Sequence, residues 1–219
     1  MHRTEPPLAA AAICLAALAG FVDALAFTSL GGFFASFMSG NSTRLGVGLA
    51  SGNWGNALVA GALVLSFVSG VILSSVIVRA QPARDKPMVM AAVTALLVLA
   101  ALVAMFAPGP LVLLLLAAAM GTENGVFTRD GEVTIGLTYL TGSLVKLGQK
   151  LAGALMGDAD RWAWAPYLML WLGFVMGVVL GAGANAAWGW TALWFAAGAS
   201  AALTGLMARI GRAGAVATS

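Results

Sequence analysis

The stretch "FMSGNSTRLGVGLA", from Phe37 to Ala50, decides the fold because "YLTGSLVKLGQKLA", from Tyr139 to Ala152, repeats its pattern. Each stretch has a small hydroxyl residue, a glycine, Asn or Ser, two further residues, a basic residue and then Leu-Gly. Each also interrupts an otherwise apolar chain. The recurrence predicts that the chain is built from two related halves.

The composition of the chain places it in a membrane. Of its 219 residues 61% are hydrophobic and only 9% are charged, whereas a soluble domain has roughly 25% charged residues. The net charge of +3 would suggest a nucleic-acid partner in a soluble protein. Here the basic residues flank apolar runs, so we predict that they orient membrane helices and that the partner is the lipid bilayer, not nucleic acid.

The chain has few residues that carry catalytic or metal chemistry. Cys14 is its one cysteine and His2 its one histidine, so neither a disulfide nor a Cys/His metal set is expected. The sequence contains no Ser-His-Asp, HExxH or P-loop arrangement. We therefore predict no cofactor, no metal and no enzymatic activity. The N-terminal apolar segment has a counterpart in the second half, so we expect a retained helix, not a cleaved signal peptide.

Six stretches are long and apolar enough to cross a bilayer, which takes about 20 residues each. Two further segments, 31–53 and 128–154, contain the repeated motifs and are too apolar for ordinary loops. We predict that both are re-entrant half-helices, enclosed by protein, because lipid does not tolerate irregular backbone. The six predicted spans are about 8–30, 57–78, 88–107, 110–127, 166–187 and 191–209.

The basic residues predict the orientation of these spans. If the half-helices do not cross, ten of the eleven basic residues lie on the side of the two termini, and only Arg44 lies on the other. The positive-inside rule then places both termini in the cytoplasm. The ten residues are Arg3, Arg79, Arg84, Lys86, Arg129, Lys146, Lys150, Arg161, Arg209 and Arg212.

The similarity of the halves extends beyond the opening motif. "SFVSGVILS" (66–74) matches "GFVMGVVLG" (173–181), and 18–27 resembles 118–127 with Asp23 opposite Asn124. Three spans per half make the second half enter from the opposite side. We therefore predict an all-α membrane protein with six transmembrane helices and two half-helices, in an inverted 3+3 repeat.

We expect one polytopic domain over 1–219, with repeat 1 at about 8–107 and repeat 2 at about 110–210. The small residues four apart in 66–74 and 173–181 predict that the second and fifth spans cross each other closely.

The repeated motifs predict a binding site. Ser39-Gly40-Asn41 and Thr141-Gly142-Ser143 are typical of helix N-caps, and a helix N-terminus attracts anions. Arg44 and Lys146, just over one turn further on, would add positive charge, so an anion, a carboxylate-bearing solute or the polar end of a metabolite would fit. Two alternatives stay open. The caps serve only their helices, and Arg44 and Lys146 reach out to lipid headgroups.

Asp23 lies mid-way along an otherwise uncharged span, where a carboxylate costs about 3 kcal/mol. It should therefore face a partner or a cavity, with Glu123 and Asn124 in the matching place of the second half. Asp23 would serve as a proton or cation relay, or as a counter-ion to Arg44. The alternative is a structural Asp–Arg pair that fixes the half-helix.

The segments "GFVDALAF", "MSGNSTRLG", "GTENGVF" and "YLTGSLVKLG" resemble the YoaK-like family of small bacterial inner-membrane proteins, a domain-of-unknown-function family. The resemblance covers about residues 12 to 210 and implies a multi-pass protein of the bacterial inner membrane, with no stated activity. Ser143 and Gly125 depart from the Asn and Ala expected by resemblance. The family's motif positions fall on Gly20, Asp23, Ala24, Ser39, Gly40, Asn41, Gly121, Asn124, Thr141 and Gly142.

Together these features predict a transporter or channel for a small solute, anionic solutes included, with its site between the two half-helix N-termini. The alternative is a membrane-embedded accessory or scaffold protein without transport activity. The small number of spans is compatible with a homodimer. The predicted substrate-binding residues are Asp23, Ser39, Gly40, Asn41, Arg44, Asn124, Thr141, Gly142, Ser143 and Lys146.

Overall fold

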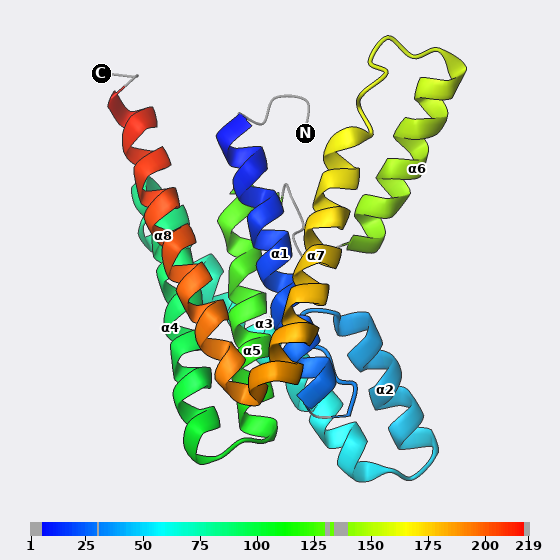
Figure 1. Cartoon of the computed structure of the whole chain (residues 1–219), viewed down its shortest axis with the longest axis vertical. Helices are drawn as coiled ribbons and strands as arrows, with labels where there is room; N and C mark the ends of the chain where they lie inside the picture. The colour runs from blue at the N-terminus through cyan, green and yellow to red at the C-terminus, as the bar shows by residue number, and fades with distance from the viewer. Residues whose placement is uncertain (1–5, 30, 130–131, 134–139, 217–219) are drawn as a thin grey trace.

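The computed structural model describes residues 6–29, 31–129, 132–133 and 140–216, and these are almost entirely helical (Figure 1). The predicted all-α class is therefore confirmed. A short antiparallel ribbon pairs β1 (Thr128–Arg129) with β2 (Glu132–Val133). The long helices are α1 (Pro6–Ser29), α3 (Trp54–Ala80), α4 (Asp85–Phe106), α5 (Pro110–Glu123), α7 (Ala165–Trp188) and α8 (Leu193–Val216).

Within the described residues, five helical stretches are long and apolar enough to cross a membrane. They are Leu8–Ser29, Trp54–Ala80, Asp85–Phe106, Pro110–Phe127 and Ala165–Ile210. The last stretch is 46 residues long and contains α7, the 3-10 turn η3 (Gly189–Ala192) and most of α8. The chain reverses at Gly189, whose positive φ of 53° suits glycine, so that α8 returns beside α4 (Figure 1).

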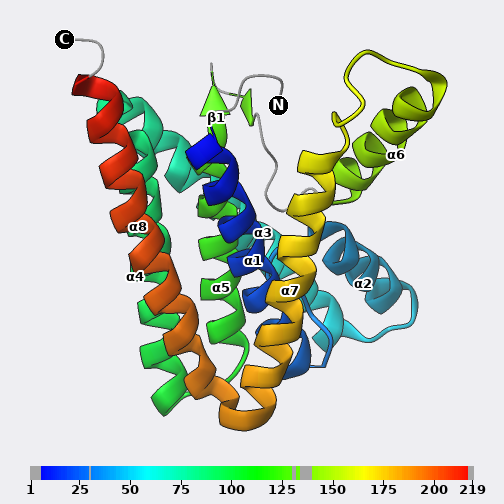
Figure 2. The same ribbon diagram turned by 45° about the horizontal axis from the view of Figure 1, so that its top comes forward.

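Two short helices occupy the predicted half-helix segments. α2 (Met38–Ala50) has 13 residues and α6 (Leu140–Met156) has 17. At 1.5 Å per residue they extend about 20 and 25 Å, less than the roughly 30 Å of a hydrocarbon core. α2 packs on α3 and α6 on α7, and the two lie toward opposite ends of the bundle (Figures 1 and 2).

Helices α1 and α5 form the centre of the bundle. Their apolar windows are 61% and 72% buried, against 17–39% for the other candidate spans. α1 packs chiefly on α7, α5 packs on α3, and α4 packs on α8. Asp23 lies on α1, Glu123 ends α5 and Asn124 follows it directly, and all three polar residues are buried.

Glycines bring the central helices into backbone contact with their neighbours. A Cβ atom at Gly177 would collide with the Ala17 carbonyl, and one at Gly70 with the Ala118 carbonyl. The small-residue faces therefore do pack closely, as predicted, but the predicted partners are wrong: α7 lies on α1 and α3 on α5. The reason is that α1 and α5 each have a glycine of their own at the contact. A Cβ atom at Gly20 would meet the backbone of α7, and one at Gly121 would meet the backbone of α3.

These contacts occur in matching pairs. Gly20 lies against Phe174 of α7, and Gly121 lies against Phe67 of α3. The Gly177–Ala17 and Gly70–Ala118 contacts form a second such pair, so these glycine contacts of the α1–α7 interface have counterparts in the α5–α3 interface.

We expect Gly177→Ala to lower the free energy of unfolding by about 1–3 kcal/mol, because the added methyl group forces α7 away from α1. Gly183→Ala is the matched control on the same helix, since a Cβ there meets nothing within 4 Å. Thermal or denaturant unfolding of the purified protein in detergent measures both. Equal effects of the two substitutions would contradict the close-packing role of Gly177.

Candidate functional site

The connection between α1 and α2 contains an irregular loop, 31–37, most of which is buried. Gly31 and Gly32 have φ values of 69° and 84°, which end α1 and turn the chain back toward it. Phe33 and Ala35 in this loop are buried. Buried backbone outside a helix needs hydrogen-bond partners, and two side chains supply them.

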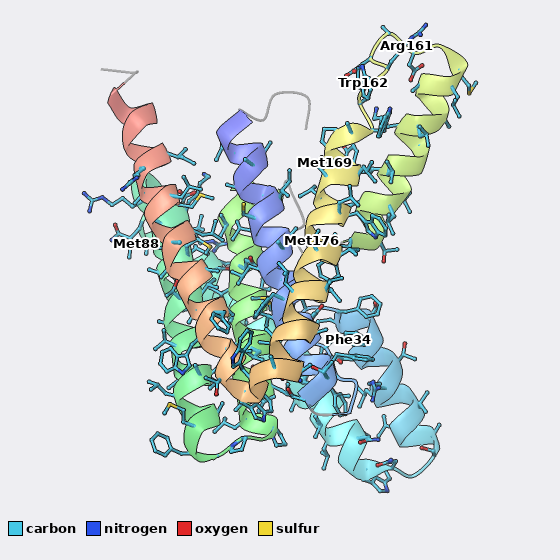
Figure 3. All side chains as sticks on the ribbon, in the orientation of Figure 1. Phe34, Met88, Arg161, Trp162, Met169 and Met176 are labelled. Atoms are coloured by element: carbon cyan, nitrogen blue, oxygen red, sulfur yellow. The ribbon has the colours of Figure 1, made fainter. Side chains whose placement is uncertain are left out.

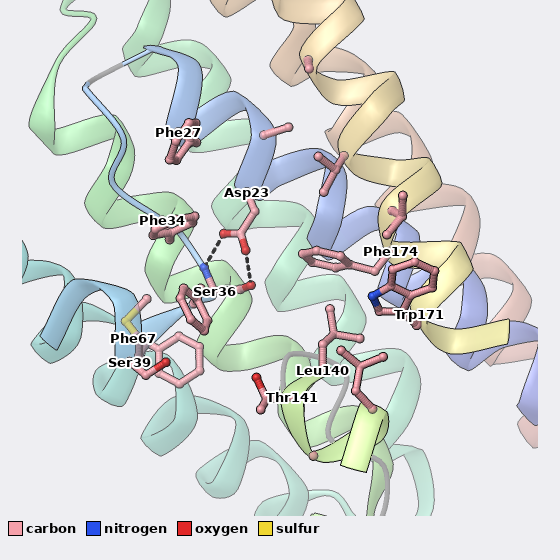
Figure 4. A pocket seen from close by; sticks show the side chains of 18 of the residues that line it. Asp23, Phe27, Phe34, Ser36, Ser39, Phe67, Leu140, Thr141, Trp171 and Phe174 are labelled. Atoms are coloured by element: carbon pink, nitrogen blue, oxygen red, sulfur yellow. Dashed lines mark hydrogen bonds between the residues drawn. The ribbon is translucent and has the colours of Figure 1, made fainter. Parts of the chain in front are cut away.

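Asp23 holds the second part of the loop. Its Oδ1 accepts hydrogen bonds from the backbone N–H groups of Ala35 at 2.8 Å and Ser36 at 2.6 Å. Its Oδ2 accepts the Ser36 hydroxyl at 2.6 Å (Figure 4). The Asp23 carboxyl group thus satisfies three donors of the loop while its side chain remains 4% exposed.

Asn41 holds the first part of the loop from the first turn of α2. Its Oδ1 accepts from the Phe34 N–H at 3.1 Å, and its Nδ2 donates to the Phe34 carbonyl at 2.7 Å. Both backbone groups of Phe34 are therefore paired by one fully buried amide.

The predicted N-cap role of the motifs is wrong for α2. Its N-cap residue is Phe37, which makes no side-chain capping bond, and Ser39-Gly40-Asn41 lie within the first turn. Asn41 reaches back to the loop instead of capping the helix. Thr141-Gly142-Ser143 likewise lie within the first turn of α6, which begins at Leu140.

Arg44 does not pair with Asp23, so the predicted Asp–Arg pair is wrong. The Arg44 guanidinium lies 4.8 Å from the centre of the Phe33 ring and against Gly32. In the described part of the chain Asp23 forms no ion pair. Lys146 is exposed on α6.

A pocket of about 800 Å³ opens beside Asp23 (Figure 4). It lies between α1, the 31–37 loop, α7 and the N-terminal ends of α2 and α6. Of the predicted site residues it brings together four, Asp23, Ser39, Thr141 and Gly142. The other six do not line it: Gly40, Asn41, Arg44, Asn124, Ser143 and Lys146.

The sequence reasoning missed the aromatic character of this pocket. Phe27 and Phe34 stack with ring centres 5.2 Å apart, and Phe34 meets Phe37 edge to face at the same distance. The cluster of phenylalanines around the Gly31-Gly32 pair was the available signal. The aromatic lining residues are Phe27, Phe34, Phe37, Phe67, Trp171 and Phe174.

Glu123 was also left out of the predicted site. It ends α5, is fully buried, and neither carboxyl oxygen has a hydrogen-bond partner among the described residues. Asn124, next to it, donates to the Met120 carbonyl at 2.9 Å. Neither Glu123 nor Asn124 lines the pocket.

Comparison with known proteins relates most of the chain to one family. Residues 11–206 match the family described as "Protein of unknown function (DUF1275)". The chain belongs to this family. The resemblance inferred from the motifs is thereby confirmed.

Two relatives are transmembrane proteins by name. The chain is 34% identical over 199 residues to "UPF0700 transmembrane protein RA0705" of Rhizobium meliloti (strain 1021), covering 89% of this chain and 84% of the relative. It is 28% identical over 153 residues to "UPF0700 transmembrane protein YoaK" of Bacillus subtilis (strain 168), covering 65% and 66%. No solved structure matches the chain. The chain is a multi-pass membrane protein of an uncharacterised family.

We expect Asp23→Ala to destabilise the protein by about 2–5 kcal/mol, because it leaves two buried N–H groups and a hydroxyl without their acceptor. Asp23→Asn retains an acceptor for the two N–H groups and should cost less. Unfolding measurements give both values, and hydrogen exchange at Ala35 and Ser36 reports the loop directly. Unchanged exchange at these two amides in Asp23→Ala would contradict the anchoring role.

We expect Glu123→Met to raise the free energy of unfolding by about 1–3 kcal/mol, since it removes a buried carboxyl group that has no hydrogen-bond partner among the described residues and retains the volume. Glu123→Gln, which leaves a polar group in the same place, is the control and should gain less. A loss of stability in Glu123→Met, measured in the same unfolding assay, would show that the carboxyl group has a partner in the folded protein.

Proposed function

We propose that the protein is a membrane transporter or channel for a small solute, which binds in the pocket beside Asp23. One observation carries this proposal. The N-terminal ends of both short helices, α2 and α6, reach the same pocket although about a hundred residues separate them. Discontinuous helices whose ends meet at a central site are typical of secondary transporters.

The transport proposal includes an inverted repeat in which the chain crosses the membrane six times. The glycine contacts of α7 on α1 reappear in those of α3 on α5, and α2 on α3 corresponds to α6 on α7. In this arrangement α7 and α8 cross separately, and α2 and α6 are re-entrant helices that enter from opposite faces (Figure 1). Solute then gains access to the pocket from either side by rearrangement of one half against the other.

The basic residues support an orientation in the inner membrane in which the N-terminal end of α1 and the C-terminal end of α8 face the cytoplasm. Arg79, Arg84 and Lys86 lie at the α3–α4 connection, and Arg209 lies near the end of α8, at the end of the bundle where α1 begins (Figure 1). Arg161 is at the same end (Figure 3). By the positive-inside rule that end faces the cytoplasm.

An accessory or scaffold role is the second candidate, and the hydrogen bonds of the loop favour it. Asp23 and Asn41, two of the predicted binding residues, direct their polar atoms at the loop backbone. In this alternative these residues only stabilise the fold, and the pocket has no solute.

Gly142→Leu separates the two candidates. Gly142 lines the pocket, and a Cβ there meets nothing within 4 Å, so a leucine takes up space at the pocket without a clash at its Cβ. Gly148→Leu, on the same helix and also unobstructed but outside the pocket, is the matched control. Both exchanges favour helix formation by about 1 kcal/mol, so neither should lower stability.

In liposomes reconstituted with the purified protein, we expect Gly142→Leu to reduce solute flux at least tenfold and Gly148→Leu to leave it unchanged. Small anions, organic acids and amines are each tested for flux into the liposomes. If the unmodified protein moves none of them, and both variants match it in flux and stability, the accessory role replaces the transport proposal.

A further inference from the structure

The pocket beside Asp23 has the wall of a site for an organic cation. Rings from α1, the 31–37 loop, α3 and α7 surround it, and Figure 4 shows Phe27, Phe34, Phe67, Trp171 and Phe174 around the carboxyl group. Aromatic ring faces carry partial negative charge and attract ammonium groups, most strongly where water is excluded.

Asp23 adds a full negative charge to this wall. Backbone N–H groups only donate, so Oδ1 acts as an acceptor to both Ala35 and Ser36, the coordination expected of a carboxylate. A carboxylate has about four lone-pair sites, and three donors occupy the Asp23 group, which leaves acceptor capacity on Oδ2. Because Asp23 forms no ion pair among the described residues, its charge has no counter-ion there.

Basic side chains are absent from the lining of the pocket as the structure describes it. Arg44 lies over the ring of Phe33 and Lys146 is exposed on α6, and neither lines the pocket. The positive contribution comes from the N-terminal ends of α2 and α6, about half an elementary charge each, which fades within one turn and is weakened by solvent. Thr141, in the first turn of α6, is exposed, whereas Asp23 is 4% exposed. The carboxylate therefore dominates the field inside the pocket.

Other ligand classes fit the lining less well. A neutral apolar molecule would bury the Asp23 charge without compensation, which is costly. A bare metal ion requires several oxygen or nitrogen ligands, and the described residues contain no cluster of three acidic, histidine or cysteine side chains. An ammonium group carrying apolar substituents satisfies the carboxylate, the rings and the aliphatic side chains of Leu140 and Val178 together.

We propose that this pocket binds an organic ammonium ion, with the cationic group between Asp23 Oδ2 and the aromatic rings and the apolar substituents toward α6 and α7. The inference names the class of solute that binds in the pocket. That the protein also transports this solute rests on the proposed function. It replaces the anionic solute expected from the motifs.

A ligand series of similar shape and different charge tests the proposal on the purified, full-length protein in detergent. The probes are benzyltrimethylammonium, 3-phenylpropanol and 3-phenylpropionate, and their dissociation constants come from thermal stabilisation and from equilibrium binding. We expect benzyltrimethylammonium to bind at least tenfold more tightly than the alcohol or the carboxylate. Equal or tighter binding of 3-phenylpropionate would overturn the proposal and favour the helix N-termini as an anion site.

Two substitutions locate the binding. Asp23→Asn should weaken benzyltrimethylammonium at least tenfold and remove its advantage over 3-phenylpropanol. Trp171→Leu should weaken it at least threefold, whereas Trp194→Leu, on α8 and outside the pocket, should not change it. Unchanged affinity in a folded Asp23→Asn protein would overturn the proposal. If Asp23→Asn does not fold, the Trp171 and Trp194 variants and the charge series decide.

The binding test and the liposome flux test can fail independently of each other. Binding of benzyltrimethylammonium without flux in liposomes would support this inference and refute the transporter. Flux of another solute, blocked by Gly142→Leu and without preference for the cation over the carboxylate, would refute this inference and support the transporter.

Discussion

The hydrogen bonds between Asp23 and the 31–37 loop are the interaction on which the rest of the site depends. An irregular backbone inside a membrane protein is stable only if its polar groups are paired, and Asp23 pairs three donors of Ala35 and Ser36. Asn41 completes the pairing at Phe34. These bonds set where α2 begins, and so place its first turn at the pocket.

The two halves of the protein share a packing plan but differ at this interaction. The glycine contacts of α1 with α7 and of α5 with α3 are equivalent in kind. In the second half the position matching Asp23 is occupied by Asn124, and the carboxyl group is one residue earlier, on Glu123, with no hydrogen-bond partner among the described residues. The polar centre of the protein is therefore asymmetric, with one carboxyl group committed to the backbone and one that is not.

Much of the fold could be predicted from the sequence because hydropathy and helix length are local properties. The first five apolar stretches agree with α1, α3, α4, α5 and α7 to within about four residues, the sixth begins near α8 but ends earlier, and each motif segment contains all or most of one short helix, α2 or α6. The helix that packs on each glycine face could not be predicted, since a face of small residues can pack closely on any helix that also has a glycine at the contact. Gly20 on α1 and Gly121 on α5 are such glycines. The role of the Asn41 amide could not be predicted, because a polar residue near the start of a helix can either cap the helix or hydrogen-bond to an adjacent loop.

The pocket, too, could be predicted only in part. The depth of Asp23 predicted a buried polar centre, and Ser39, Thr141 and Gly142 were found at its edge. The aromatic wall was not foreseen because its rings come from several elements that only the folded chain brings together. The absence of Arg44 from the pocket lining follows from the loop geometry at Gly32 and Phe33, which no spacing rule encodes.

The contacts of α1 also set an order for assembly during synthesis. The bonds that shape the 31–37 loop join residues 23 to 41, so this part of the site is complete as soon as α2 has left the ribosome. The glycine face of α1 can pack only after α7 is synthesised, and Gly177 of α7 is about 150 residues further along the chain. The partner of α3, helix α5, is synthesised much sooner after it. Until α7 is synthesised, that face of α1 lacks its partner in the folded protein. The protein thus spends most of its synthesis with one wall of its pocket already shaped and the facing wall still missing.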